Sequence, residues 1–89
     1  MSIDSGIKII YADDCPDCAR MKKLVRDSIS ETESSAMAFY YNCEEEAALD
    51  VAVGFGITDI PGCYAFGRVF EGPDFDEKEM KRFLIEKMS

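Results

Sequence analysis

The chain has 89 residues, 47% of them hydrophobic, and a formal net charge of -8. A chain of this length can bury one core but not a core plus an independent second module, so we expect a single domain over residues 1–89. The balance of 18 acidic against 10 basic residues opposes binding to nucleic acid or to an anionic membrane surface. Because the chain has no histidine, any catalysis must use thiols, carboxylates, lysines or tyrosines.

The sequence also predicts where the protein works. No apolar run approaches the roughly 18 to 20 residues that a membrane-spanning helix requires. The first residues, MSIDSGIKII, lack the basic start and the long apolar middle of a secretory signal. We therefore expect a cytoplasmic protein, and we expect it to be a monomer.

The first half of the chain predicts a strand, a helix and a second strand. The segment Ile7 to Ala12 is β-branched and aromatic, which is typical of a strand covered on both faces at the centre of a sheet. From Pro16 to about Ser30, apolar residues recur every three to four positions and indicate an amphipathic helix. Its apolar stripe consists of Cys18, Met21, Leu24 or Val25, and Ile29. After a polar loop, the segment Ala36 to Tyr41 supplies a second strand, and this order implies a parallel pair with a right-handed crossover.

A second helix is predicted over residues 44–53. Asn42, followed by Glu45, is a candidate capping box at its start, and Gly54 and Gly56 would end it. The acidic residues in its first turn suit the positive end of the helix dipole.

The last part of the chain predicts a hairpin and a closing helix. Strands over residues 63–66 and 69–71 flank the pair Gly67 and Arg68, which suits a type II′ turn. Asp76 and Glu79 mark the start of the helix, and its apolar stripe consists of Met80, Phe83, Leu84 and Met88. The predicted order is β-α-β-α-β-β-α, an α/β fold with four strands in a mixed sheet flanked by helices.

Two cysteines, Cys15 and Cys18, lie at the predicted start of the first helix. With Cys15 as the N-cap, Pro16 falls at the first helical position, where proline is favoured, and Asp17 at the second. An N-cap side chain accepts hydrogen bonds from backbone N–H groups, so the pKa of Cys15 should lie below the free value of about 8.5. Cys18 falls on the apolar stripe and should be shielded. This asymmetry suits disulfide exchange, in which Cys15 attacks and Cys18 resolves the mixed disulfide.

Three aspartates, Asp13, Asp14 and Asp17, surround this cysteine pair. At about 6 to 10 Å and a surface dielectric of about 40 to 80, each would cost the thiolate under about 1 kcal/mol. We therefore expect an activated thiol that is less acidic than one with basic neighbours. The same charges should disfavour acidic targets and favour basic or neutral ones.

Other interpretations of the cysteines stay open. A pair with this spacing can be half of a zinc site, although Cys43 and Cys63 are isolated and no histidine can complete the ligand set. Cys15 and Cys18 could also form an inert structural disulfide or remain two unreactive core thiols. We expect Cys43 and Cys63 to pack as small apolar side chains, with a second disulfide or a metal as the less favoured alternative, and we predict no metal site.

The strand-CPDC-helix start, together with Gly56-Ile57-Thr58-Asp59-Ile60-Pro61, resembles the thioredoxin-fold oxidoreductases, in particular small glutaredoxin-like and thioredoxin-like proteins. The resemblance covers nearly the whole chain. It implies a thioredoxin-like fold and thiol-disulfide oxidoreductase activity at Cys15 and Cys18. It also implies that Pro61 is cis and packs against the cysteine pair, and that Ile60 offers backbone hydrogen bonds to a bound substrate chain. With Pro16 and Asp17, these residues form the expected substrate-binding set.

The same resemblance implies the partners. These are protein disulfide substrates and a thioredoxin-reductase-type electron donor, with no cofactor beyond the redox-active disulfide. Glutathione is the alternative donor, although EGPDFD (71–76) is only loosely similar to the glycine-glycine-acid turn with which glutaredoxins bind it. Thioredoxins typically carry a buried acid on the strand before the cysteines, where this chain has Ile9, and an aromatic residue where it has Asp14. A thioredoxin-like binding or redox-sensing module with idle cysteines is therefore a further alternative.

Overall fold

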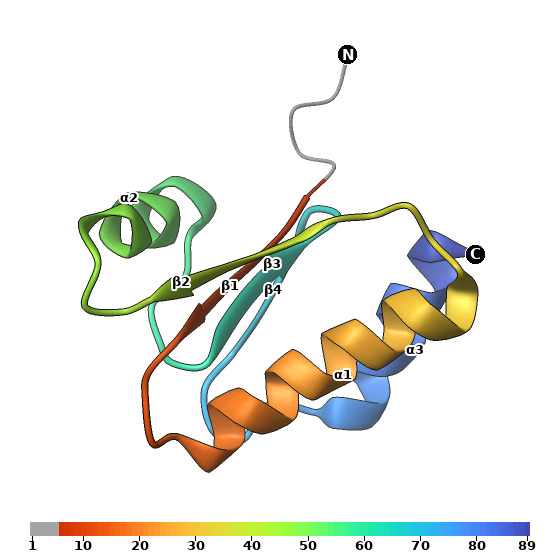
Figure 1. The fold of residues 1–89 in the computed structure, drawn as a ribbon, viewed down its shortest axis with the longest axis horizontal. Coiled ribbons are helices and arrows are strands. Elements are labelled where there is room, and N and C mark those ends of the chain that lie inside the picture. Colours follow the sequence, from red (N-terminus) through yellow and green to blue (C-terminus); the bar gives the residue numbers. More distant parts are fainter. Residues whose placement is uncertain (1–5) are drawn as a thin grey trace.

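The computed structural model describes residues 6–89, and over this range the elements follow the predicted order (Figure 1). The strands are β1 (Ile7–Tyr11), β2 (Ala38–Asn42), β3 (Gly62–Ala65) and β4 (Arg68–Glu71), and the helices are α1 (Pro16–Thr32), α2 (Glu46–Phe55) and α3 (Glu77–Met88). Within these residues no helix is long and apolar enough to cross a membrane. The prediction about a secretory signal rests partly on residues 1–5, which lie outside the described residues.

The four strands form one mixed sheet in the order β2-β1-β3-β4. As predicted, β1 is central and pairs in parallel with β2, whereas β3 pairs antiparallel with both β1 and β4. The register places Gly62 opposite Ile10. Pro61 therefore lies at the end of the sheet where β1 finishes and the chain turns toward Cys15.

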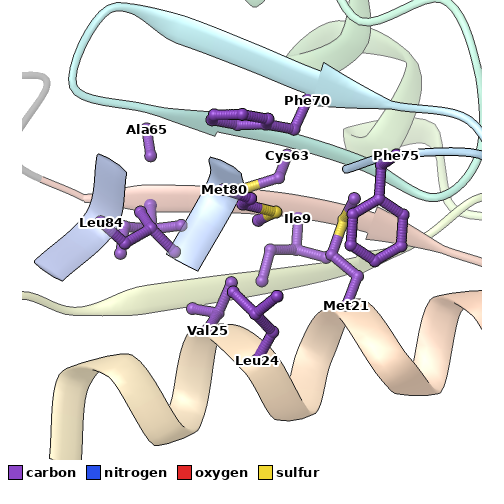
Figure 2. Close-up of a cluster of buried hydrophobic side chains, with 11 residues drawn as sticks. Ile9, Met21, Leu24, Val25, Cys63, Ala65, Phe70, Phe75, Met80 and Leu84 are labelled. Carbon is purple, nitrogen blue, oxygen red and sulfur yellow. The ribbon is translucent and has the colours of Figure 1, made fainter. Parts of the chain in front are cut away.

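Helices cover both faces of the sheet, with α1 and α3 side by side on one face and α2 on the other (Figure 1). Because side chains alternate along a strand, Ile7 and Ile9 point toward α1 and α3 while Ile10 points toward α2. The main core contains Ile9, Met21, Val25, Cys63, Met80 and Leu84, drawn in Figure 2. The smaller core under α2 consists of Ile10, Ala48 and Ile57. Most of the buried apolar surface therefore lies between the sheet and the α1/α3 layer.

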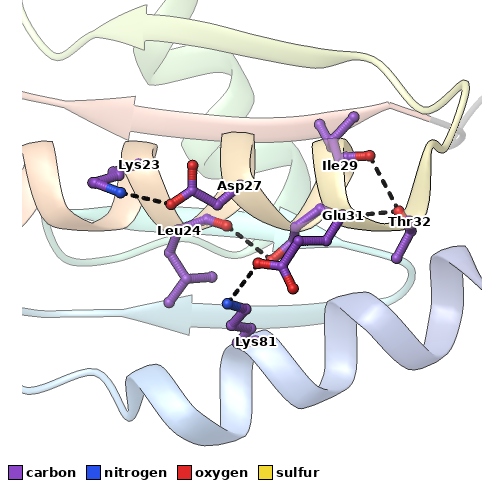
Figure 3. Close-up of polar contacts among 8 residues, drawn as sticks. Lys23, Leu24, Asp27, Ile29, Glu31, Thr32 and Lys81 are labelled. Atoms are coloured by element: carbon purple, nitrogen blue, oxygen red, sulfur yellow. Dashed lines mark hydrogen bonds and ion pairs between the residues drawn. The ribbon is translucent and has the colours of Figure 1, made fainter.

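Ion pairs border the contact between α1 and α3. The Lys81 ammonium lies 2.7 Å from Glu31, and this carboxylate raises the pKa of Lys81 (Figure 3). Along α1, Lys23 lies 2.7 Å from Asp27 and lowers the pKa of that carboxyl. Exposed pairs of this kind contribute little to stability because solvent screens them and long side chains must be ordered. The packed core, rather than these pairs, holds the two helices together.

The predicted start of the second helix is wrong. Asn42 is the last residue of β2, and α2 begins only at Glu46, with Glu45 as its N-cap. The expected contacts do form, since the Asn42 N–H donates to Glu45 Oε1 at 2.8 Å and the Glu44 N–H donates to Asn42 Oδ1 at 2.9 Å. These bonds close the turn between β2 and α2 instead of capping the helix.

Two turn predictions also need correction. Gly54 lies inside α2, and only Gly56, with φ of 78°, ends the helix in the left-handed conformation. The hairpin turn consists of Phe66 and Gly67, with φ of 50° and 85°, which is the pattern of a type I′ turn and not of type II′. Arg68 is the first residue of β4.

Candidate functional site

Helix α1 begins at the cysteine pair, as predicted. Cys15 is the N-cap, with an extended backbone (φ -118°, ψ 102°), and Pro16 occupies the first helical position. The backbone N–H of Cys18 donates to Cys15 Sγ at 3.1 Å. The sequence CPDC thus places a sulfur acceptor at the end of a helix where free N–H groups and the dipole favour negative charge.

Cys15 and Cys18 form a disulfide, and their Cα atoms are 5.2 Å apart. The two sulfur-bearing side chains differ in access, because Cys18 is 1% exposed whereas Cys15 is only partly covered. The Ala12 N–H also donates to Cys18 Sγ, at 3.5 Å. Cys15 is therefore the sulfur that an incoming thiol or disulfide can reach, and Cys18 lies beneath it.

A cleft of about 540 Å³ opens at this cysteine pair, and we call it the cysteine cleft. Both cysteines and Pro16 line it, together with Tyr11, Asp13, Asp14 and Lys22. Lys22 Nζ lies 3.9 Å from the centroid of the Tyr11 ring, a cation–π contact that holds the ammonium at the cleft wall. The cleft thus combines two sulfurs, an aromatic ring, one cation and two carboxylates.

The larger groove of about 780 Å³ between α1 and α3 lies away from this chemistry. It has no cysteine in its lining, and its polar side chains include Arg20, Lys23, Asp27 and Glu77. Arg20 pairs with Glu77 at 3.6 Å, and Lys23 pairs with Asp27. We interpret the groove as a solvated seam between two helices, because charged side chains make up most of its lining.

Asp17 behaves differently from the other two aspartates. It lies 3.0 Å from Arg20, which also donates to the Pro73 carbonyl, and it does not line the cysteine cleft. Its negative charge is therefore partly balanced. Asp13 and Asp14 are exposed at the cleft, and Asp14 adopts a positive φ of 55° in the turn that leads to Cys15. A contact between Asp17 and substrate stays a prediction.

The Ile60–Pro61 peptide bond is cis, as the family resemblance implies. Pro61 is fully buried, and its carbonyl accepts a hydrogen bond of 2.8 Å from the N–H of Gly72. The Ile60 N–H donates to Asp59 Oδ1 at 2.8 Å, so this group is already occupied in the present conformation. Ile60 and Pro61 do not line the cysteine cleft. Their predicted contact with substrate stays a prediction.

Ile60 instead lines a second cleft, of about 200 Å³, between α2 and residues 57–60, which we call the α2 cleft. Its apolar lining includes Ile10, Leu49 and Ile57. Cys43 also lines it, and the Cys43 N–H donates to the Tyr11 carbonyl at 2.7 Å. The α2 cleft shares no lining residue with the cysteine cleft, but both lie at the end of β1, where Ile10 lines the α2 cleft and Tyr11 lines the cysteine cleft.

The two remaining cysteines have different environments. Cys63 is fully buried in the main core, as predicted, and burial raises the pKa of its thiol to about 12. The prediction that Cys43 packs is wrong, because Cys43 is exposed in the turn between β2 and α2, outside both cores. Within residues 6–89, no group of His, Cys, Asp or Glu side chains could hold a metal ion.

The sequence did not lead us to expect Lys22 at the cysteine cleft. It follows Cys18 by one helical turn, and residues four apart on a helix are neighbours on its surface, so this spacing could have revealed it. The position where thioredoxins typically carry a buried acid is taken by Ile9, which is 0% exposed. With no acid at that position, the charged side chains that line the cysteine cleft are Asp13, Asp14 and Lys22, and Lys22 is the one cation among them.

Comparisons with known proteins bear on the fold. No protein-family model matches the sequence, and a search of curated proteins finds no match. Among solved structures, an uncharacterised thioredoxin-like protein from Clostridium perfringens is similar, with 20% identity, a TM-score of 0.70, and coverage of 94% of this chain and 70% of that one. An oxidised thioredoxin from Plasmodium falciparum has 16% identity and a TM-score of 0.66, with coverage of 94% and 81%.

A thioredoxin mutant from Halobacterium salinarum gives a comparable result. Its identity is 22% and its TM-score 0.66, and the match covers 94% of this chain and 74% of that one. At such identities the likeness establishes the fold and not the activity. The chain has a thioredoxin-like α/β fold with a disulfide between Cys15 and Cys18 at a helix N-terminus.

Proposed function

We propose that this thioredoxin-like chain is a thiol-disulfide oxidoreductase that exchanges its Cys15–Cys18 pair with disulfides in other proteins. The observation that carries the proposal is the asymmetry of the pair. Cys15 is the partly exposed cap of α1 and accepts a hydrogen bond from the Cys18 N–H, whereas Cys18 is 1% exposed. An accessible sulfur at a helix N-terminus favours a thiolate, and a covered neighbour favours intramolecular resolution over further attack from solvent.

The reaction runs in two displacement steps. The Cys15 thiolate attacks one sulfur of the target disulfide, whose S–S bond breaks, and the electron pair leaves on the other target sulfur as a thiolate. Cys18 then loses its proton and attacks Cys15 Sγ, which breaks the mixed disulfide and releases the second target thiolate. The target gains two electrons and two protons, and the chain ends as the Cys15–Cys18 disulfide. A dithiol donor of the reductase class restores the reduced form.

The fate of the Cys18 proton follows from the site. Ile9 occupies the strand position below the cysteines and is fully buried in apolar surroundings, so it offers no base. The cysteine cleft also holds the carboxylates of Asp13 and Asp14, so we infer that water or one of these carboxylates accepts the proton. The resolving step should therefore accelerate as pH rises, because a larger fraction of Cys18 is then ionised.

Reduction of insulin disulfides, with dithiothreitol as the electron source, tests the proposal. Wild-type protein should accelerate the reaction, and Cys15→Ser should lose the acceleration. Cys18→Ser should accumulate a mixed disulfide on Cys15, which mass spectrometry detects. Cys43→Ser is the matched control for removing a thiol and should keep the wild-type rate. Equal rates for wild type and Cys15→Ser would remove the catalytic claim.

The cellular setting is part of the proposal. A cytoplasmic monomer fits a dithiol that must be kept reduced, and a flavoprotein reductase of the thioredoxin-reductase type is the proposed donor. Glutathione with glutathione reductase is the competing donor. Turnover in that system, together with a Cys15-glutathione adduct in Cys18→Ser, would identify glutathione and not a reductase as the electron donor. A Cys15 pKa at or above about 8.5 would instead indicate a binding module with idle cysteines.

A further inference from the structure

Large apolar side chains that remain exposed gather on β2, on α2 and on the residue before β2. Within residues 6–89 they are Met37, Phe39, Tyr40, Leu49 and Val53. Leu49 and Val53 are 67% and 76% exposed and lie one turn apart on α2, so they form a stripe that faces away from the core. Contiguous exposed apolar surface of this kind is typical of an interaction site.

This stripe borders the α2 cleft, which lies at the same end of β1 as the cysteine cleft. Leu49 and Ile60 both line the α2 cleft, so the stripe on α2 continues onto the loop before β3. The successive residues Ile10 and Tyr11, at the end of β1, line the α2 cleft and the cysteine cleft respectively. A polypeptide whose disulfide reaches Cys15 can therefore extend along the end of β1 toward α2.

The surface around the stripe is negatively charged. Residues 27–67 contain eight acidic residues and no lysine or arginine. Those on α2, at its start and in the adjoining loop are Glu44, Glu45, Glu46, Asp50 and Asp59, and no ion pair among the described residues involves them. The base that contacts α2 is Lys8, which lies over the Phe55 ring at the last residue of the helix and does not line the α2 cleft. Of these five carboxylates, Asp59 lines the α2 cleft, and the other four lie on α2 or just before it.

From these observations we propose that α2 and residues 57–60 dock the target polypeptide, and that they select segments in which apolar side chains are flanked by lysine or arginine. This inference rests on the proposed function, because docking serves to bring a disulfide to Cys15. The apolar part of the segment covers Leu49 and Val53. Its basic residues face the carboxylates of α2 and Asp59, and such complementarity raises the rate of encounter and sets specificity.

A pair of matched peptides tests the preference. Both contain the same disulfide and the same apolar residues, and they differ only in carrying lysines or glutamates at the flanks. Wild-type protein should reduce the basic peptide with a kcat/KM about tenfold higher at low salt, and the ratio should fall toward one at high salt as charges are screened. Equal values at low salt, or a preference for the acidic peptide, would overturn the inference.

Apolar docking has its own variant and control. Leu49→Ser should lower kcat/KM for the basic peptide several-fold relative to the rate with hydroxyethyl disulfide, which is too small to span both clefts. Met37→Ser removes a comparably exposed apolar side chain at the other end of β2 and should leave this ratio unchanged. Equal ratios for the two variants would overturn the inference. So would a dimer in sedimentation experiments that Leu49→Ser abolishes, because a second copy would then cover the stripe.

The charge of the α2 surface is tested by Asp50→Asn, with Glu86→Gln on α3 as the control that removes the same charge elsewhere. Asp50→Asn should reduce the preference for the basic peptide about twofold, and Glu86→Gln should not change it. The rate with hydroxyethyl disulfide distinguishes a failure of the proposed function from a failure of the docking inference alone. If wild-type protein fails to reduce it and forms no adduct on Cys15, the proposed function fails. If it reduces all substrates without preference, only the docking inference fails.

Discussion

Replacing Gly62 by alanine should destabilise the fold and displace the loop that carries Ile60 and Pro61. A Cβ at position 62 would overlap Ile57 Cγ2 and would lie 2.8 Å from the backbone oxygen of Asp59. Neither neighbour can yield easily, since one belongs to a buried side chain and the other to the backbone. Inserting a methyl group into a packed interior costs about 1–3 kcal/mol, and we expect the upper part of this range.

Gly54 provides the matched control. It lies within α2, and a Cβ there would meet nothing within 4 Å. Because alanine is the better helix former, Gly54→Ala should stabilise the protein by about 0.5–1 kcal/mol. The same chemical change should therefore have opposite signs at two glycines that lie eight residues apart in the sequence.

Thermal unfolding of the oxidised proteins measures both effects. For a domain of this size about 1 kcal/mol shifts Tm by roughly 4–8 °C, so Gly62→Ala should lower Tm by about 10 °C or more and Gly54→Ala should raise it by a few degrees. Insulin reduction by Gly62→Ala should also slow at temperatures where the variant is folded. An unchanged Tm for Gly62→Ala, or shifts of the same sign for both variants, would refute the packing argument.

Two further predictions concern the cysteines and their charged neighbour. Lys22→Gln should raise the pKa of the Cys15 thiol by about half a unit to one unit, because it removes the cation at the cysteine cleft, and Lys23→Gln, whose ammonium pairs with Asp27 instead, should not. Alkylation rates against pH measure this, and equal shifts for the two variants would contradict a local role. In native oxidised protein at pH 8, iodoacetamide should label Cys43 and spare Cys63, whose thiol stays protonated and covered until the chain unfolds. Labelling of Cys63 at the rate of Cys43 would show that the main core opens readily.

The features that were predicted correctly from the sequence depend on residues that lie close together in the chain. The CPDC motif contains the cap, the proline that suits the first helical position and the buried cysteine, and the structure has each in that place. At α3 the Asp76 side chain accepts a hydrogen bond from the N–H of Glu79 at 3.1 Å, as the spacing indicated. Local hydrogen bonding and steric preference are sufficient for such sites.

The predictions that proved wrong concern residues whose structure depends on contacts with segments far away in the sequence. The bonds expected between Asn42 and Glu45 form, but pairing with β1 keeps Asn42 in β2 and delays the helix. Cys43 was expected to pack, yet no layer covers it at the end of an edge strand. Phe39 and Tyr40 are partly exposed for the same reason. An apolar sequence indicates a strand, whereas the position of that strand at the edge of the sheet depends on contacts from the rest of the chain.

The candidate site likewise has some features that the sequence predicts and others that depend on the fold. The cysteine pair at the start of α1 could be located from its motif, and the cis proline from the family resemblance. Lys22 at the cysteine cleft, the Asp59 carboxylate on the Ile60 N–H and the position of the α2 cleft depend on three-dimensional placement.

The central claim is that the start of α1 activates the Cys15 thiol. Alkylation of the fully reduced protein across pH, with mass spectrometry to follow each cysteine separately, tests it most directly. We expect Cys15 to react first and to titrate with a pKa below about 8.5, while Cys18 reacts more slowly than Cys15 at every pH. A Cys15 pKa at or above that value, or faster labelling of Cys18, would contradict the account.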